Sequence, residues 1–93
     1  MKVSDDVRAT HSPDGAIVLD IRHGQMFRLN LVGSRMLELL KQGLSEEEIA
    51  TKVSEQFSIG RDTAAADLHE FLAHLERHRL VETISFPERT KSF

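Results

Sequence analysis

The sequence predicts an α+β fold in which an N-terminal three-stranded antiparallel sheet is followed by three helices. Residues 16–21 are rich in β-branched side chains, which indicates a strand whose alternate residues face opposite sides. Turn sequences at 13–15 and 22–24 end in glycine and separate the predicted strands. The capping residues Asn30 and Ser45 then introduce segments with helical spacing of apolar residues. A chain of 93 residues with 40% hydrophobic content is long enough for one domain.

The three predicted strands cover residues 1–8, 16–21 and 25–29. Alternate residues of the middle strand face opposite sides of the sheet. One side has Ile17, Leu19 and Ile21, and the other has Ala16, Val18 and Asp20. The third strand alternates in the same way, with Phe27 and Leu29 on one side and Met26 and Arg28 on the other. Because Gly24 suits the positive φ of a tight hairpin turn, we expect the second and third strands to pair directly.

Three helices are predicted after the strands, and their connections are very short. Asn30 is the N-cap of the first helix, which runs to about residue 42, and Gly43 supplies its C-terminal stop. Ser45 and Glu48 form a capping box for the second helix. The third helix covers residues 61 to about 78. Apolar residues spaced by three and four mark the sides expected to be buried, namely Val32, Met36, Leu39, Leu40, Ile49, Val53, Phe57, Leu68, Phe71, Leu72 and Leu75.

Composition excludes several classes of protein. There is no Cys, so disulfides, thiolate metal sites and cysteine nucleophiles are absent. The formal net charge of −3, with Lys and Arg scattered among acidic residues, argues against a broad nucleic-acid-binding face. No signal peptide or membrane-spanning run is recognisable, so a soluble cytoplasmic protein is expected. We expect a folded domain over residues 1–82 and a flexible tail over 83–93, where periodicity is lost.

Several short motifs occur in a fixed order along the chain. They are Asp14-Gly15 with Val18-Leu19-Asp20, Gly24-x-x-Phe27-x-Leu29-Asn30-x-x-Gly33, Leu40-x-x-Gly43 with Glu48-Ile49-Ala50, and Asp67-Leu68-x-x-Phe71-Leu72-x-x-Leu75-x-x-x-x-Leu80-Val81. The ordered set resembles the PqqD-like family of small winged helix-turn-helix domains, known as RiPP recognition elements, over roughly residues 3–82. The chain departs from that family at Leu37, where an aromatic residue is common, and at Arg79, where a small residue is usual.

The resemblance implies a non-catalytic adaptor that binds the leader of a ribosomally synthesised precursor peptide and presents it to a modifying enzyme. In this family the leader adds as a strand beside the third strand, in a groove closed by the third helix. The expected enzyme partner is a radical enzyme or a leader protease and cyclase, of a lasso-type or related pathway. No cofactor, nucleic acid or membrane partner is expected. A monomer or weak homodimer is expected, because a free strand edge can pair with a second copy.

The same resemblance assigns peptide-binding residues to the third strand and the third helix. On the strand they are Gln25, Met26, Phe27, Arg28 and Leu29, and on the helix they are Ala64, Asp67, Phe71 and His74. Since the strand lacks Pro, each of its residues can donate to a guest strand. Other interpretations stay open for four of them. Met26 fits a side chain that covers a neighbouring one. Phe71 fits the core stripe, Arg28 fits a solvated surface charge, and Asp67 fits an acceptor near the helix start.

Other functions are compatible with parts of the sequence. The main alternative is a winged-helix DNA-binding regulator with the third helix in the major groove. Its acidic residues Asp62, Asp67 and Glu70 would repel phosphate, which argues against that alternative. His74 and His78 have the i, i+4 spacing of a zinc pair, with Glu70 one turn earlier. Glu70 lies outside the His-Glu-x-x-His arrangement and no third His is near, so no metal site is predicted. The chain has no nucleophile-elbow or phosphate-loop motif, and no catalytic residue is predicted.

Overall fold

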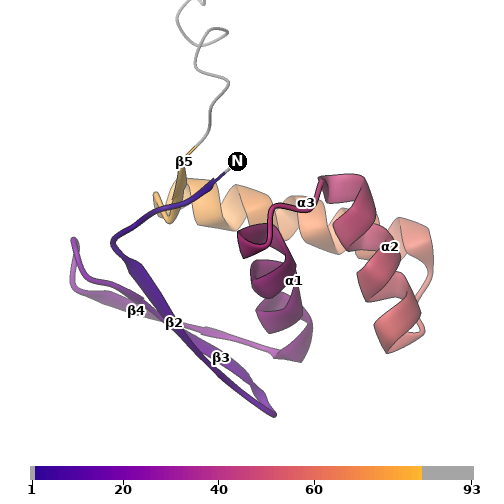
Figure 1. Cartoon of the computed structure of the whole chain (residues 1–93), viewed down its shortest axis with the longest axis horizontal. Coiled ribbons are helices and arrows are strands. Elements are labelled where there is room, and N and C mark those ends of the chain that lie inside the picture. Colours follow the sequence, from indigo (N-terminus) through magenta and orange to yellow (C-terminus); the bar gives the residue numbers. More distant parts are fainter. Residues whose placement is uncertain (1, 83–93) are drawn as a thin grey trace, which may run out of the picture.

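The computed structural model describes residues 2–82 and confirms the predicted α+β fold, a three-stranded antiparallel sheet followed by three helices (Figure 1). The sheet has the order β2-β3-β4, and both of its strand pairs are antiparallel. A separate pair joins the two ends of the described chain, β1 with β5. The elements are β1 (Lys2–Val3), β2 (Val7–Ser12), β3 (Gly15–Asp20), β4 (Gln25–Leu29), α1 (Leu31–Lys41), α2 (Glu46–Phe57), α3 (Arg61–Arg77) and β5 (Val81–Glu82).

The predicted first strand over residues 1–8 is wrong, because a turn divides this segment. The N–H of Val7 donates to the carbonyl oxygen of Ser4 (3.1 Å), and the N–H of Asp6 donates to Ser4 Oγ (3.3 Å). The short piece before the turn is β1, which pairs with β5, and the strand of the main sheet is β2. Met1 and the predicted tail over 83–93 lie outside the described residues.

β3 and β4 form an antiparallel hairpin, in which β3 is the central strand of the sheet and β4 an edge strand. Its register pairs Val18 with Phe27 and Ala16 with Leu29. Ala16, Val18 and Asp20 face the helices and are buried, whereas Ile17 and Leu19 remain 45% and 42% exposed on the outer face. Gly15 is required at the start of β3, because a side chain there would overlap the carbonyl oxygen of Leu29.

The helix caps agree with the sequence. Asn30 Oδ1 accepts from the N–H of Gly33 (2.8 Å) at the start of α1, and Gly43 adopts φ +88° after its end. The capping box of α2 is complete, with Glu48 Oε1 accepting from the Ser45 N–H (2.9 Å) and Ser45 Oγ accepting from the Glu48 N–H (3.2 Å). These contacts satisfy N–H groups that a helix start leaves unpaired.

The core lies where α1 packs between the sheet and the other two helices (Figure 1). The fully buried large side chains include Val18, Met36, Leu37, Leu39, Ile49, Val53, Leu75 and Leu80. Most of the predicted stripe is buried, but Val32, Phe57 and Phe71 are half-buried at its border. Leu37 joins the core, so the apolar face of α1 is wider than the predicted one. No helix within residues 2–82 has the length and apolar character needed to cross a bilayer.

Candidate functional site

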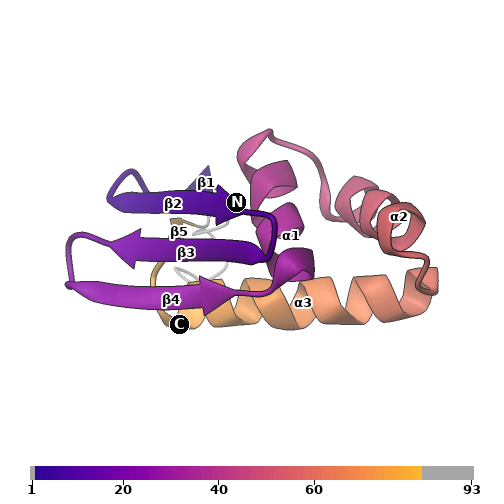
Figure 2. The same ribbon diagram turned by 90° about the horizontal axis from the view of Figure 1, so that it is seen from below.

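A groove of about 760 Å³ lies between β4 and α3. Figure 2 shows the two elements running in opposite directions, so the start of β4 lies beside the end of α3. The lining residues are Arg28, Leu29 and Asn30 from the strand side, Val32, Gly33 and Met36 from α1, and Asp67, Glu70, Phe71, His74 and Arg77 from α3. Three elements therefore form the walls and floor of one open channel.

The strand side of this groove is a free sheet edge. β4 is the last strand in the order β2-β3-β4, and within the described part of the chain no strand pairs with its outer side. An edge strand presents N–H and C=O groups that an added strand can satisfy. β4 contains no Pro, so its backbone donors are complete.

The helix side of the groove is a stripe along α3. Asp67, Phe71 and His74 follow helical spacing on one side of the helix, and Glu70 and Arg77 extend the same stripe. Phe71 is half-buried and reaches α1, where its ring lies 3.7 Å from the place a side chain on Gly33 would occupy. Because Gly33 has no side chain, the space beside Phe71 stays open.

Aromatic and imidazole rings connect the two walls. The Phe27 ring centroid lies 5.9 Å from that of His74, with an interplanar angle of 89°, and 4.7 Å from that of His78. The ring centroids of His74 and His78 are 4.5 Å apart. Burial, then the neighbouring charges of His78 and Arg77, lower the pKa of His74, so its neutral form is favoured in the fold. His74 therefore contributes a neutral ring to its contact with Phe27.

The structure brings five of the nine predicted site residues to the groove lining: Arg28, Leu29, Asp67, Phe71 and His74. Phe27 lies just behind them, against His74. Gln25 borders a second, smaller hollow at the hairpin end, which is also lined by His23, Arg77, His78 and Arg79. Arg77 lines both hollows, so the smaller one lies next to the groove.

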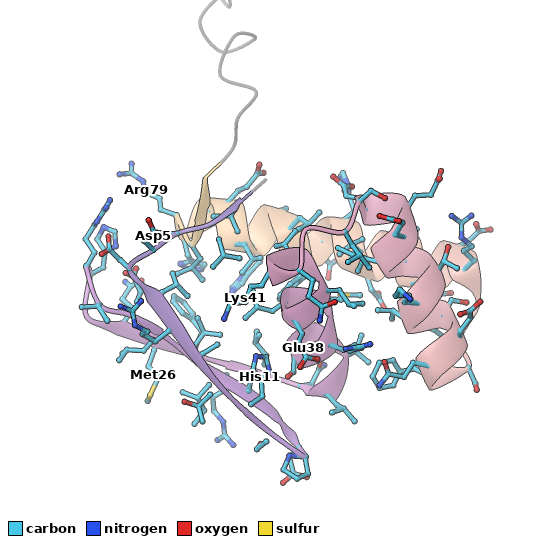
Figure 3. The ribbon with its side chains drawn as sticks, viewed as in Figure 1. Asp5, His11, Met26, Glu38, Lys41 and Arg79 are labelled. Carbon is cyan, nitrogen blue, oxygen red and sulfur yellow. The ribbon has the colours of Figure 1, made fainter. Side chains whose placement is uncertain are left out.

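Two predicted residues lie elsewhere. Met26 is 66% exposed and points away from the helices, because alternation along β4 turns it to the outer face (Figure 3). Ala64 was expected to leave room along the groove, but it is fully buried in the core and absent from the lining. Ala64, three residues before Asp67, therefore lies on the side of α3 that faces the core and not on the groove side.

Sequence reasoning missed Asn30, Val32, Gly33, Met36, Glu70 and Arg77 as groove residues. Helical spacing from Asp67 contains a signal for Glu70 and Arg77, which are three and ten residues further along the helix. The α1 residues have no such local signal. They reach the groove because α1 packs against the sheet and because Phe71 of α3 lies beside Gly33, which is a tertiary arrangement.

The free edge of β4 and the groove beside it have features that suit binding. His74 and His78 are adjacent, but the described residues contain no group of three side chains that could hold a metal ion. A close serine–histidine contact, His11 Nδ1 to Ser34 Oγ at 2.7 Å, lies outside the groove lining and joins β2 to α1. A backbone edge beside a channel with apolar and charged walls suits an extended peptide.

Comparisons with known proteins identify related sequences and structures. A family model described as coenzyme PQQ synthesis protein D (PqqD) matches residues 15–81. A structure of TbiB1 in complex with the TbiA(beta) leader peptide is 36% identical, with a TM-score of 0.83, covering 91% of this chain and 99% of that one. A lasso peptide synthetase B1 complexed with the leader peptide has a TM-score of 0.79 at 18% identity, covering 88% of this chain and 96% of that one, and it supports the fold. No curated protein sequence matches the chain.

Proposed function

The chain belongs to the PqqD family, and from this premise we propose that it is a non-catalytic adaptor that binds the leader segment of a ribosomally synthesised precursor peptide. The observation that carries the proposal is the free edge of β4 beside the groove. The similarity to TbiB1, a protein solved with a leader peptide, supports it further. The adaptor would hold the leader while a separate enzyme modifies the rest of the precursor.

The leader would bind as a strand added to β4. The five residues of this strand offer an edge of about 17 Å, which suits a guest segment of similar length. Main-chain hydrogen bonds would supply affinity that does not depend on the guest sequence. Side chains of the guest on the helix side would contact Phe71 and His74, which are half-buried and can be covered further.

The role of the adaptor would be to raise the local concentration of the precursor at the enzyme. Tethering two partners through a third protein can raise overall affinity by about a hundredfold or more without new contacts between them. The enzyme we propose is a radical enzyme or a leader protease and cyclase. A DNA-binding role has no observation in its favour, since the groove side of α3 begins with the exposed acids Asp67 and Glu70.

The proposal is tested by titrating the full chain with the leader of the precursor encoded beside its gene. We expect a Kd on the order of micromolar and amide shifts in nuclear magnetic resonance spectra concentrated on β4 and the groove side of α3. Absence of binding up to millimolar leader, or shifts confined to another surface, would contradict it.

A variant that fills the groove provides the matched test. Gly33→Leu places a side chain between Leu29 and Phe71, so leader affinity should fall by at least about tenfold, since the guest is displaced sterically. Glu55→Leu introduces the same side chain at an exposed position of α2 and should bind like the parent protein. Circular dichroism establishes that both variants are folded before the titrations are compared.

A further inference from the structure

The two ends of the groove carry opposite charge. The acids Asp67 and Glu70 line the groove from α3, and since this helix runs opposite to β4 they lie toward the Leu29 and Asn30 end (Figure 2). At the hairpin end, the hollow beside Gln25 is lined by His23, Arg77, His78 and Arg79. Because α3 runs opposite to β4, the sign of the wall changes from negative to positive as β4 is followed back from its end to its start (Figure 2).

These charges are available to a guest. Asp67, Glu70, Arg77 and Arg79 are all exposed, and none of them takes part in the ion pairs found within residues 2–82. Those pairs are Arg22 with Asp6, His23 with Asp20, and Arg35 with Glu38. Of the residues that line the hairpin-end hollow, His23 is already paired with Asp20, whereas Arg77 and Arg79 remain available to an external partner.

Arg79 lies in the turn that ends α3. Arg79 has φ +58°, in the left-handed region, where a residue with a side chain costs roughly 1 kcal/mol or more relative to glycine. The N–H of Arg79 donates to the Glu76 carbonyl oxygen (3.0 Å) and that of Leu80 to the Leu75 carbonyl oxygen (2.8 Å), so this conformation ends the helix. The side chain extends from the turn after α3 at the hairpin end of the molecule (Figure 3).

We propose that the groove selects extended peptides with an acidic side chain at the hairpin end, a basic side chain about four residues away, and an apolar side chain between them. This inference rests on the proposed leader binding and specifies the class of leader. From Asp67 to Arg77 α3 rises about 15 Å, which an extended guest covers in about four or five residues. A spacing of four keeps both charged side chains on the face toward α3. The apolar side chain would lie against Phe71 and His74.

Arg28 acts on the other face of the guest. Phe27 and Leu29 face the helices, so alternation turns Arg28 to the outer side of β4 at the acidic end of the groove. It would pair with an acidic guest residue that points away from α3. In a guest antiparallel to β4, the base facing α3 comes first and the acid follows about four residues later.

A displayed library of random peptides of about twelve residues, longer than the β4 edge, provides the test. The library is selected on the immobilised full chain at low salt, because salt screens exposed charges. We expect enriched peptides to share an acid and a base four positions apart. A synthetic pair of one composition, with the acid and base exchanged, should then differ in Kd by about tenfold, with the difference shrinking in high salt.

Charge reversal of the protein identifies the residues responsible. The double variant R77E and R79E should enrich a base in place of the acid, and the double variant D67K and E70K should enrich an acid in place of the base. The double variant K41E and K52E makes the same change in net charge as the first one, at exposed positions outside the groove, and should retain the parent pattern.

The outcomes separate this inference from the proposed function. Peptides that are enriched without a charge pattern, or with one that the groove variants do not alter, would overturn the selectivity and leave the adaptor role standing. Failure to enrich any peptide, together with failure of the encoded leader to bind, would overturn both.

Discussion

Asp20 is a charged side chain in the interior, only 2% exposed at the end of β3. Its Oδ1 accepts from the His23 N–H (3.3 Å), and its Oδ2 lies 2.8 Å from His23 Nδ1. Burial acts to raise the pKa of Asp20, but the hydrogen bonds and charge of His23 outweigh it and lower the pKa below the ordinary 3.8. The carboxylate thus closes the turn that leads into β4.

Asp20→Asn should weaken the acid sensitivity of the protein. A carboxyl whose pKa is lowered in the fold contributes stability above its unfolded pKa of 3.8, and this contribution is lost as pH falls through the folded pKa. Urea unfolding midpoints measured between neutral pH and strong acid should therefore decline less in the variant than in the parent. The interpretation fails if the two proteins lose stability in parallel below pH 3.8.

His74 should give a second pH dependence, at higher pH. Its pKa is lowered in the fold, so the unfolded chain binds more protons just below the ordinary value of 6.5. The contribution of neutral His74 to the free energy of unfolding is complete above pH 6.5. It is lost as the pH falls from 6.5 through the pKa of His74 in the fold. His74→Phe keeps a ring against Phe27 and removes the titration, so its unfolding midpoint should be flat across this window. Equal slopes in parent and variant would exclude His74 as the source.

Tertiary packing determines which of the two faces of β3 is buried. Ala16, Val18 and Asp20 are buried, although Ile17, Leu19 and Ile21 form the more apolar set. Val18 packs in the core at 1% exposure, while Ile17 is 45% exposed on the outer face. The cost of truncating a side chain on this strand should therefore depend on its face and not on its hydrophobicity.

Val18→Ala should cost about 2 kcal/mol of unfolding free energy, since it removes buried methyl groups and leaves a cavity. Ile17→Ala removes more carbon but should cost less than about 1 kcal/mol, because the side chain is half in water. Chemical denaturation of both variants checks the prediction. A larger loss for Ile17→Ala would mean that the outer face is covered in solution.

The start of α2 is stabilised by the capping box of Ser45 and Glu48. Ser45 and Glu48 satisfy each other's backbone N–H groups, and the hydrogen bonds from Ser45 lower the pKa of Glu48. Ser45→Ala should lower the unfolding free energy by about 1 kcal/mol, as expected for loss of an N-cap. Glu55→Ala, an exposed change in the same helix, is the control and should stay within about 0.5 kcal/mol of the parent.

At the scale of the whole fold, the two ends of the described chain, β1 and β5, pair with each other. β1 pairs with β5 through Val3 and Val81, and the Ser4 N–H donates to the Leu80 carbonyl oxygen (2.9 Å). This pairing anchors the end of α3, which forms one wall of the groove. The groove therefore depends on residues far from it in the sequence.

A chain lacking residues 1–3 should retain the fold but lose protection against hydrogen exchange at β5. Hydrogen exchange at β5 amides should become faster, because their partner strand is gone, while β3 amides should exchange as before. Leader affinity should fall modestly as the end of α3 becomes less ordered. Unchanged exchange at β5 would show that β1 contributes nothing to closure.

Local signals predicted the larger part of the fold. Asn30, Gly43 and the capping box of Ser45 and Glu48 mark the helix ends, and the structure places the ends within about a residue of them. The prediction failed over residues 1–8, where the division into β1 and β2 depends on a partner strand at the far end of the chain. Ala64 was misplaced for a similar reason, since its burial depends on which helices surround it.

By itself, the sequence determined the order of the elements, most of their boundaries and the family, because caps, turns and periodic side chains act over a few residues. Only the tertiary structure decided which face of β3 is covered, which α1 residues form the groove floor, and that Asp67 and Arg77 border opposite ends of one channel. These features follow from contacts between distant segments. Burial is a property of such contacts, and the spacing of neighbours along the chain does not specify it.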